Sequence, residues 1–320
     1  MMGDMKAARE IKRFEVAVGD GFRLEEAVCF YGFFVLAPNR WLPAEQVLVR
    51  PLRVEGKVIE AHVSQKGAKL AVQVKPGVSE AGKAEVDAAI RRMLRLDEGF
   101  ADWWAKHAEA KRRGFGRMFR SPSVFEDVVK TFTTCNVTWP NTKRMNELLV
   151  SEVGGGAFPG PARLAAVTEE ELKAMAKVGY RAARMIRLAE DVLSGAVDLA
   201  GLEDPQMGDD ERYKRLRAIH GLGPYGAANM CQLLGDYERV PIDSETHRHF
   251  CKKMKLARPR NAGEVRKLNA KIERHYGKWE PYQFLAYWYD LWLGYEEKLE
   301  KESAAWLHEE TSVFTASEMG

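Results

Sequence analysis

A glycine turn and an aspartate twenty residues beyond it carry the residue types best suited to chemistry. Segment 216–229 reads LRAIHGLGPYGAAN, and segment 240–250 reads VPIDSETHRHF. Two glycines two residues apart, Gly221 and Gly223, allow positive φ and a close approach of the backbone to a ligand. Pro224 suits the first turn of a following helix, whose free amides and dipole favour an anion such as phosphate.

The interior of the same segment fits two helices joined by a tight turn. We expect Leu222 to point inward and pin the two helices together, while Ala227 and Ala228 allow them to pack closely. A Gly-x-Gly between helices is a weak signal, so an ordinary helical hairpin without a ligand remains an alternative.

Asp243 precedes another helical segment and has two interpretations. Its carboxylate can stabilise positive charge on a sugar ring and orient or deprotonate an attacking water. We expect it to stay ionised, because a helix dipole favours an anion at the N-terminus. Asp is also a favoured N-cap residue, so Asp243 can simply cap the helix, and the two roles are compatible.

Together these segments resemble the helix-hairpin-helix DNA glycosylase superfamily, which includes the 3-methyladenine and 8-oxoguanine DNA glycosylases. The shared pattern is L-x-x-I-x-G-L-G-x-x-x-A, then about twenty residues, then V-P-x-D-x-x-x-x-R/H. VGYRAARMIRLAEDV resembles the family helix that opens with G-Y-R-A, and KWEPYQFLAYWYDLW resembles its closing helix. The strand-rich front, with YGFF, resembles the N-terminal sheet domain of longer members. The resemblance covers about residues 22–298.

This resemblance implies a partner and a set of site residues. The partner is damaged double-stranded DNA, from which a flipped base is cut with Asp243 as the catalytic residue. Tyr180 is the implied wedge and Arg181 faces the orphaned base, although a buried core Tyr180 is equally open. Asn136 is a second wedge residue, or a helix cap. The hairpin residues that contact DNA are Gly221, Leu222, Gly223, Tyr225 and Gly226.

The resemblance also implies the base pocket and a cation. Tyr225 and Trp139 are the expected pocket residues. Backbone carbonyls of Arg217, Ile219 and Leu222 occupy the positions that bind a monovalent cation, K⁺ or Na⁺, in the family; we expect no other cofactor.

Tyr225 also bears on the reaction type. Bifunctional members have a Lys at this position, and its amine attacks the sugar. Tyr225 therefore favours a monofunctional glycosylase that uses water. Two alternatives stay open: an inactive DNA-binding protein, and a bifunctional 8-oxoguanine-type glycosylase/lyase with a relocated amine. Alkylated purines are the first expected lesion, and oxidised guanine is the second.

The elements that must position these residues predict an α+β fold. Strand-like runs cover 13–18, 28–36, 46–54, 57–63 and 69–74, with a hairpin turn at Gly56, and indicate an antiparallel sheet of about five strands. Helical periodicity begins at Ser79 and continues, with a capping box of Thr168 and Glu171. We expect a β domain over 1–78, a helical glycosylase body over 79–300 and a C-terminal tail over 301–320.

Composition bounds the remaining possibilities. The chain has 320 residues, 46% hydrophobic and 30% charged, with a net charge of +3, which is typical of a globular protein. No apolar run suits a membrane span or a signal peptide, so we expect the protein in the nucleus of a eukaryote or otherwise in the cytoplasm. We also expect a monomer. The four cysteines form no C-x-x-C pair, which argues against a zinc site or an iron–sulfur cluster.

Two further groups of charged residues have open interpretations. The basic run at 106–120, KHAEAKRRGFGRMFR, can attract a polyanion or form a solvated helix face. His247 and His249 lie two apart, which does not place them on one helix face. A solvated or phosphate-facing role fits these histidines better than a metal pair.

Overall fold

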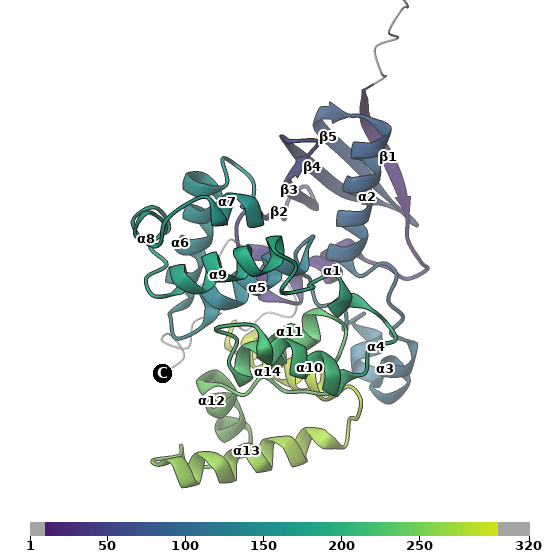
Figure 1. The fold of residues 1–320 in the computed structure, drawn as a ribbon. Helices are drawn as coiled ribbons and strands as arrows, with labels where there is room; N and C mark the ends of the chain where they lie inside the picture. Colours follow the sequence, from purple (N-terminus) through teal and green to yellow (C-terminus); the bar gives the residue numbers. More distant parts are fainter. Residues whose placement is uncertain (1–9, 300–320) are drawn as a thin grey trace, which may run out of the picture.

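The computed structural model describes residues 10–299, and the predicted tail at 301–320 lies outside this range. An antiparallel sheet precedes a helical body (Figure 1), as predicted. The strands are β1 (Ile11–Ala17), β2 (Arg40–Leu42), β3 (Val47–Val54), β4 (Lys57–Lys66) and β5 (Lys69–Val78). The helices are α1 (Leu24–Cys29), α2 (Glu80–Leu94), α3 (Ala101–Lys106), α4 (Ala108–Arg112), α5 (Val124–Thr134), α6 (Trp139–Leu148), α7 (Pro161–Ala165), α8 (Glu169–Ala176), α9 (Arg181–Leu193), α10 (Asp209–Ala218), α11 (Pro224–Leu233), α12 (Ser244–Lys253), α13 (Ala262–Gly277) and α14 (Gln283–Leu299). Short 3-10 helices η1 (Gly32–Val35) and η3 (Gly201–Glu203) and a π-helix η2 (Leu149–Val153) complete the elements.

The sheet has the order β1-β5-β4-β3-β2, and every neighbouring pair is antiparallel. Val54 pairs with Lys57 across a two-residue turn, in which Glu55 and Gly56 have φ of 52° and 76°. This is the geometry of a tight β-hairpin turn, so the predicted hairpin at Gly56 is confirmed. Helix α2 packs on the sheet with a buried apolar face that includes Val86 and Ile90.

The prediction of a strand over 28–36 is wrong. The segment contains the end of α1 and the 3-10 helix η1, and the short strand β2 follows it. Its aromatic run, including Phe30, Tyr31 and Phe33, is buried on all sides and shows no alternation of buried and exposed positions. A short apolar run of this kind does not distinguish a strand from a buried helix by periodicity.

A buried ion-pair cluster joins the sheet to the helical body. The guanidinium of Arg50 on β3 lies 2.5 Å from the carboxylate of Glu126 on α5. Lys130, one turn further along α5, lies 2.7 Å from the same carboxylate. Burial alone would raise the pKa of Glu126, but the two cations lower it to about 2. The sheet is therefore joined to α5 by an ion pair whose carboxylate, Glu126, stays ionised at neutral pH.

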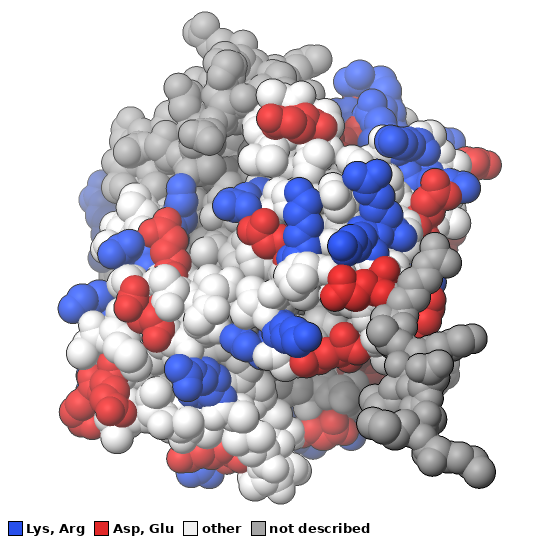
Figure 2. Space-filling model, turned by 90° about the horizontal axis from the view of Figure 1, so that it is seen from above, with Lys and Arg blue, Asp and Glu red and all other residues white. Residues whose placement is uncertain are grey.

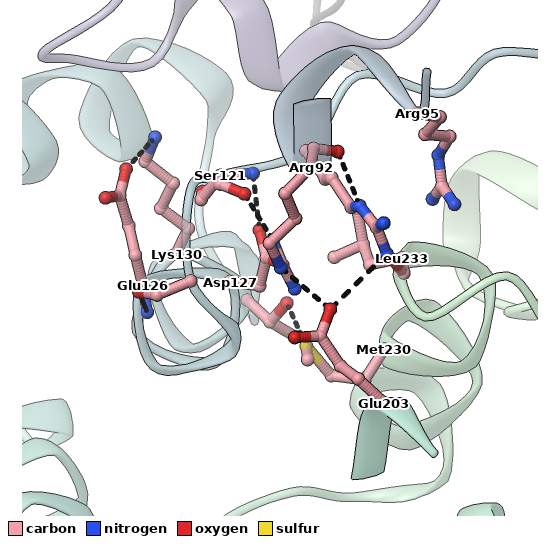
Figure 3. A network of polar contacts seen from close by, with 12 residues as sticks. Arg92, Arg95, Ser121, Glu126, Asp127, Lys130, Glu203, Met230 and Leu233 are labelled. Carbon is pink, nitrogen blue, oxygen red and sulfur yellow. Dashed lines mark hydrogen bonds and ion pairs between the residues drawn. The ribbon is translucent and has the colours of Figure 1, made fainter. Parts of the chain in front are cut away.

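Two arginines donate hydrogen bonds to carbonyls at the C-terminal end of α11. Arg95 donates to the carbonyl of Gln232 at 2.6 Å, and Arg120 donates to that of Leu233 at 2.8 Å. Arg120 also donates to the carbonyl of Arg92, whose guanidinium contacts Asp127 at 2.9 Å (Figure 3). Cations are favourable at a helix C-terminus, where carbonyls lack helical partners. This network fixes α11 against α2 and α5.

The basic run at 106–120 is used mainly for internal contacts. Arg113 pairs with Glu296 on α14, and Arg117 and Arg120 donate to backbone carbonyls. For these three arginines, neither expected role holds, because their guanidinium groups already have partners inside the fold. Across the face shown in Figure 2, Lys and Arg are interspersed with Asp and Glu, so it is not a continuous basic surface.

The four cysteines are free thiols, and three of them are buried. Within residues 10–299 no group of three or more His, Cys, Asp and Glu side chains is placed to bind a metal ion. Over the same range, none of the helices combines the length and the apolar character that a membrane crossing requires.

The hydrogen bonds to the end of α11 predict a large difference in stability between variants of Arg95, the C-cap of α2, and Arg91, within α2. Arg95→Met removes a buried guanidinium, leaving Glu98 and two carbonyls without that partner, and should lower the free energy of unfolding by about 3–5 kcal/mol. Arg91→Met breaks only partly exposed pairs with Asp87 and Asp97 and should cost about 0–1 kcal/mol. Denaturant unfolding measures both; equal losses would contradict the assigned role of Arg95.

Candidate active site

The predicted hairpin is present, with α10 and α11 joined by a short turn. Gly221 has a φ of 92°, in the region that favours glycine. Gly223 has a φ of −73° and is the N-cap of α11, so only Gly221 adopts the positive φ that both glycines allow. A Cβ on Gly223 would meet no atom within 4 Å, which leaves this side of the turn open.

The interior of the hairpin is as predicted. Leu222 is buried, and a Cβ on Gly226 would lie 3.0 Å from its Cδ2. Ala227 and Ala228 are buried as well, which permits close packing of α10 and α11. The amide of Ala227 is bonded to the carbonyl of Gly223. The amides of Tyr225 and Gly226 lie before this first helical bond, where an outside acceptor can reach a helix N-terminus.

Asp243 is the N-cap of α12, as one of its two interpretations requires. Its Oδ1 accepts from the amide of Thr246 at 2.8 Å and lies 3.0 Å from the Thr246 hydroxyl. That hydroxyl also contacts the phenol of Tyr287 on α14 at 2.9 Å. A chain of hydroxyl groups therefore leads from Tyr287 through Thr246 to the carboxylate, and both of these side chains are buried.

The charge state of Asp243 is a balance between burial and hydrogen bonding. Burial raises the pKa of the carboxyl above its ordinary value, and the bonds from Thr246 act in the opposite direction. The sequence-based expectation rested only on the helix dipole, which favours the anion. The structure shows that desolvation is the larger effect, and the bonds from Thr246 oppose it in favour of the carboxylate.

Tyr225 lies in the first turn of α11, where the hairpin meets the surroundings of Asp243. Burial raises the pKa of its phenol well above the ordinary value, and the Asp243 charge and the groups of Tyr31 and Cys135 add to the increase. Tyr225 is therefore neutral at physiological pH and lies within electrostatic range of Asp243. The structure brings together these two predicted residues.

Tyr31 is a component of the site that the sequence did not reveal. Its hydroxyl donates to Oδ1 of Asn229 on α11 at 2.8 Å, and its ring centroid lies 5.1 Å from that of Trp288 on α14. Trp288 in turn donates to the carbonyl of Phe30 at 2.7 Å. Contacts between segments about 200 residues apart leave no signal in local periodicity; only the aromatic richness of both segments hinted at them.

Trp139, the other predicted pocket residue, begins α6 and is partly buried. A Cβ on Gly32 would lie 3.4 Å from two atoms of its indole ring. Gly32 follows Tyr31 directly, so Trp139 packs beside the segment that contacts α11 and α14.

Tyr180 and Asn136 lie on the surface. Tyr180 is 47% exposed, and the guanidinium groups of Arg181 and Arg184 lie 4.6 and 4.8 Å from its ring centroid. The buried-core alternative for Tyr180 is therefore wrong. Asn136 is exposed, with a φ of 50°, in the loop between α5 and α6.

Arg181 differs from its predicted position. It is 6% exposed and donates to the carbonyls of Phe132 at 3.0 Å and Cys135. The prediction that it faces an orphaned base requires correction, because its donors are used to fix the end of α5 and the Asn136 loop. Arg184, one turn further, lies against the hairpin instead: a Cβ on Gly221 would be 2.6 Å from its Cδ.

Two of the three carbonyls predicted for a monovalent cation accept hydrogen bonds within the hairpin. The carbonyl of Leu222 accepts from the guanidinium of Arg217 at 2.6 Å, and that of Ile219 accepts from the amide of Leu222. The cation site stays a prediction. His247 and His249 have separate surroundings: His247 contacts Asn269 at 2.7 Å, and His249 is buried.

Comparison with known proteins locates this arrangement among solved structures. No protein-family profile and no curated protein sequence matches the chain. The 3-methyladenine DNA glycosylase of Archaeoglobus fulgidus superposes with a TM-score of 0.63 at 15% identity, covering 90% of this chain and 100% of that one. The 8-oxoguanine glycosylase/lyase of Clostridium acetobutylicum superposes with a TM-score of 0.64 at 16% identity, covering 90% and 100%. MBOgg1, in complex with a low-affinity DNA ligand, gives 0.64 at 18%, covering 91% and 98%.

This chain has the DNA glycosylase fold. The superpositions cover 90–91% of this chain, and its sheet and helices confirm the α+β fold class predicted from the sequence. At such low identity the likeness concerns the fold, and the chemistry has to be argued from this chain's own residues.

The two turn glycines predict separable effects. Gly221→Ala would hold a Cβ in the left-handed region and displace Arg184, so the free energy of unfolding should fall by about 1–2 kcal/mol. Gly223→Ala has room and extended backbone, so its stability should change by less than about 0.5 kcal/mol. Its methyl group stands where a phosphate would approach, so duplex DNA should bind more weakly. Unchanged stability of Gly221→Ala in thermal and denaturant unfolding would refute this.

The capping hydroxyl of Thr246 predicts a pH effect. Thr246→Val removes a hydrogen bond to the ionised carboxylate, which raises the pKa of Asp243 further. Loss of activity on acidification should then begin at a pH about one unit higher, from the usual strength of such bonds. Thr246→Ser keeps the hydroxyl and is the matched control. The measurement is the pH profile of base release; superimposable profiles for Val and Ser would count against the role.

Proposed function

We propose that this protein is a monofunctional DNA N-glycosylase that flips a damaged base out of duplex DNA and hydrolyses its N-glycosidic bond. The observation that carries the proposal is the position of Asp243. A partly buried carboxylate, capped by Thr246, lies within electrostatic range of Tyr225, and Tyr225 is in the first turn of the hairpin helix. A carboxylate beside a DNA-binding turn can stabilise the cationic sugar that forms as the bond breaks.

The DNA contacts proposed for the hairpin are backbone contacts. The open side of the turn at Gly223 and the amides that follow it suit a phosphate of the DNA backbone. Arg184 packs against Gly221 and stacks on Tyr180, which supplies a guanidinium beside the same turn. The exposed Tyr180 and Asn136 are proposed to fill the space left by the flipped base.

Alkylated purines are the proposed lesion class. Tyr225 lies within electrostatic range of the carboxylate and of Tyr31, and Trp139 packs beside Gly32, which follows Tyr31. Neutral aromatic rings of this kind attract a positively charged base through cation–π interaction. The 3-methyladenine glycosylase of similar fold acts on bases of this kind by its name. Oxidised guanine is the second candidate, favoured by the likeness to the 8-oxoguanine glycosylase/lyase.

Water is the proposed nucleophile because the lyase position carries Tyr225. A phenol whose pKa is raised by burial is a poor nucleophile and cannot form a Schiff base. Lys130, a buried amine on α5, is paired with Glu126. We therefore expect no covalent adduct when the protein is mixed with lesion-bearing DNA and borohydride. A trapped adduct would instead support the bifunctional alternative.

Asp243→Asn tests the proposal directly. Single-turnover release of free base is measured from duplexes that carry 3-methyladenine, 7-methylguanine or 8-oxoguanine. The variant should lose at least about 100-fold in rate, since the lost charge stabilises the transition state. Asn still caps α12, so duplex binding should persist.

The stability of the same variant has a predicted sign. Burial raises the pKa of Asp243 above its unfolded value, so ionisation at neutral pH disfavours the folded state. Removing the charge should leave the free energy of unfolding at pH 7 unchanged or higher.

Binding without release from any duplex by the wild type would support the inactive DNA-binding alternative.

A further inference from the structure

A cavity lies between the C-terminal half of α12, the segment that follows this helix, and α14. Its volume is about 570 Å³. The side chains that line it include no Asp or Glu. They are Arg248, His249, Cys251, Lys252, Lys255, Leu256, Arg258, Leu291, Gly294 and Tyr295.

The cations of this cavity differ in how far they are already neutralised. Arg248 is paired with Glu245, and Lys252 lies 3.6 Å from Glu297. Lys255 and Arg258 form no ion pair among the described residues. They also belong to a stretch, 252–278, with ten Lys and Arg against two Glu. The local field therefore favours an anion, and two cationic groups are available to contact it.

His249 lines the cavity and has a hydrogen-bonding atom without a partner within residues 10–299. It is 8% exposed, and its Nε2 is buried with no hydrogen-bond partner among the described residues. A buried polar atom without a partner is unfavourable, and its presence calls for an explanation such as a bound ligand. Burial lowers the pKa of His249 to about 4, so the neutral ring can present an N–H donor at physiological pH.

We infer that this cavity binds a phosphate group, with Lys255, Arg258 and His249 as its ligands. The donor set matches phosphate chemistry: a guanidinium fork, a mobile ammonium and a neutral imidazole that can donate an N–H. The site is distinct from the proposed catalytic function. Asp243 caps the N-terminus of α12, whereas Lys255 and Arg258 follow its C-terminal end, roughly 15 Å away along the helix axis. We expect a small phosphate compound, and competition with DNA distinguishes it from a backbone phosphate.

Calorimetric titration with inorganic pyrophosphate tests the inference. The full-length protein should bind it saturably, and Lys255→Gln/Arg258→Gln should weaken binding at least tenfold. Lys57→Gln, on the exposed end of β4, is the control and should bind as the wild type does. His249→Phe should also weaken binding; because His249 is buried, the exposed double variant decides if His249→Phe does not fold.

Competition with DNA identifies the source of the phosphate. A saturating duplex with a non-cleavable abasic site should leave the pyrophosphate affinity unchanged. A loss of pyrophosphate affinity would still support the phosphate site, with a backbone phosphate of DNA as its occupant. No saturable binding by the wild type, equal binding by the double variant, or the same heat from sodium chloride at equal ionic strength would overturn the inference.

Discussion

A carboxylate that is largely removed from water but has to remain ionised is the constraint on which the site depends. Burial of Asp243 raises its pKa, and the amide and hydroxyl of Thr246 offset part of that effect. Tyr287 contacts the same hydroxyl, so α14 contributes to the state of a side chain on α12. Asp243 is therefore both the N-cap of α12 and the proposed catalytic group, because the hydrogen bonds from Thr246 that begin α12 also favour its anion.

That constraint extends to the scaffold. The carboxylate can act only if α11 holds Tyr225 and the hairpin turn beside it. Contacts at the C-terminal end of α11 keep that helix in position. Arg95 and Arg120 donate to carbonyls at its C-terminal end. Arg120 also donates to the carbonyl of Arg92 on α2, and the guanidinium of Arg92 contacts Asp127 on α5. Tyr31 and Asn229 add a bond from the N-terminal segment. Buried polar contacts of this kind fix position, since each loses much of its value if the geometry shifts.

The sequence predicted those features that depend on local chemistry. Turn residues, caps and periodicity identified the hairpin at Gly56, the capping box of Thr168 and Glu171, the inward Leu222 and the order of sheet and helices. The prediction failed where burial on all sides erases periodicity, as in the aromatic run around Tyr31. It also failed for Arg181, because sequence does not tell whether a guanidinium meets DNA or the protein's own carbonyls.

Long-range partners were also beyond the reach of the sequence. Thr246 follows Asp243 closely enough for a capping box, but Thr at that position is not the usual Glu or Gln, and its contact with Tyr287 spans 41 residues. The arginines of the 106–120 run find carbonyls and Glu296 that are distant in the chain. Such contacts depend on how helices pack, which residue type and spacing do not encode locally.

The most direct test of this account is the pKa of Asp243, measured by ¹³C NMR of its carboxyl group and compared with the acidic midpoint of base release. The account predicts that the two midpoints coincide and lie above the ordinary value of an aspartate. An unshifted carboxyl, or base release that persists well below its pKa, would contradict the claim that this ionised carboxylate drives the reaction.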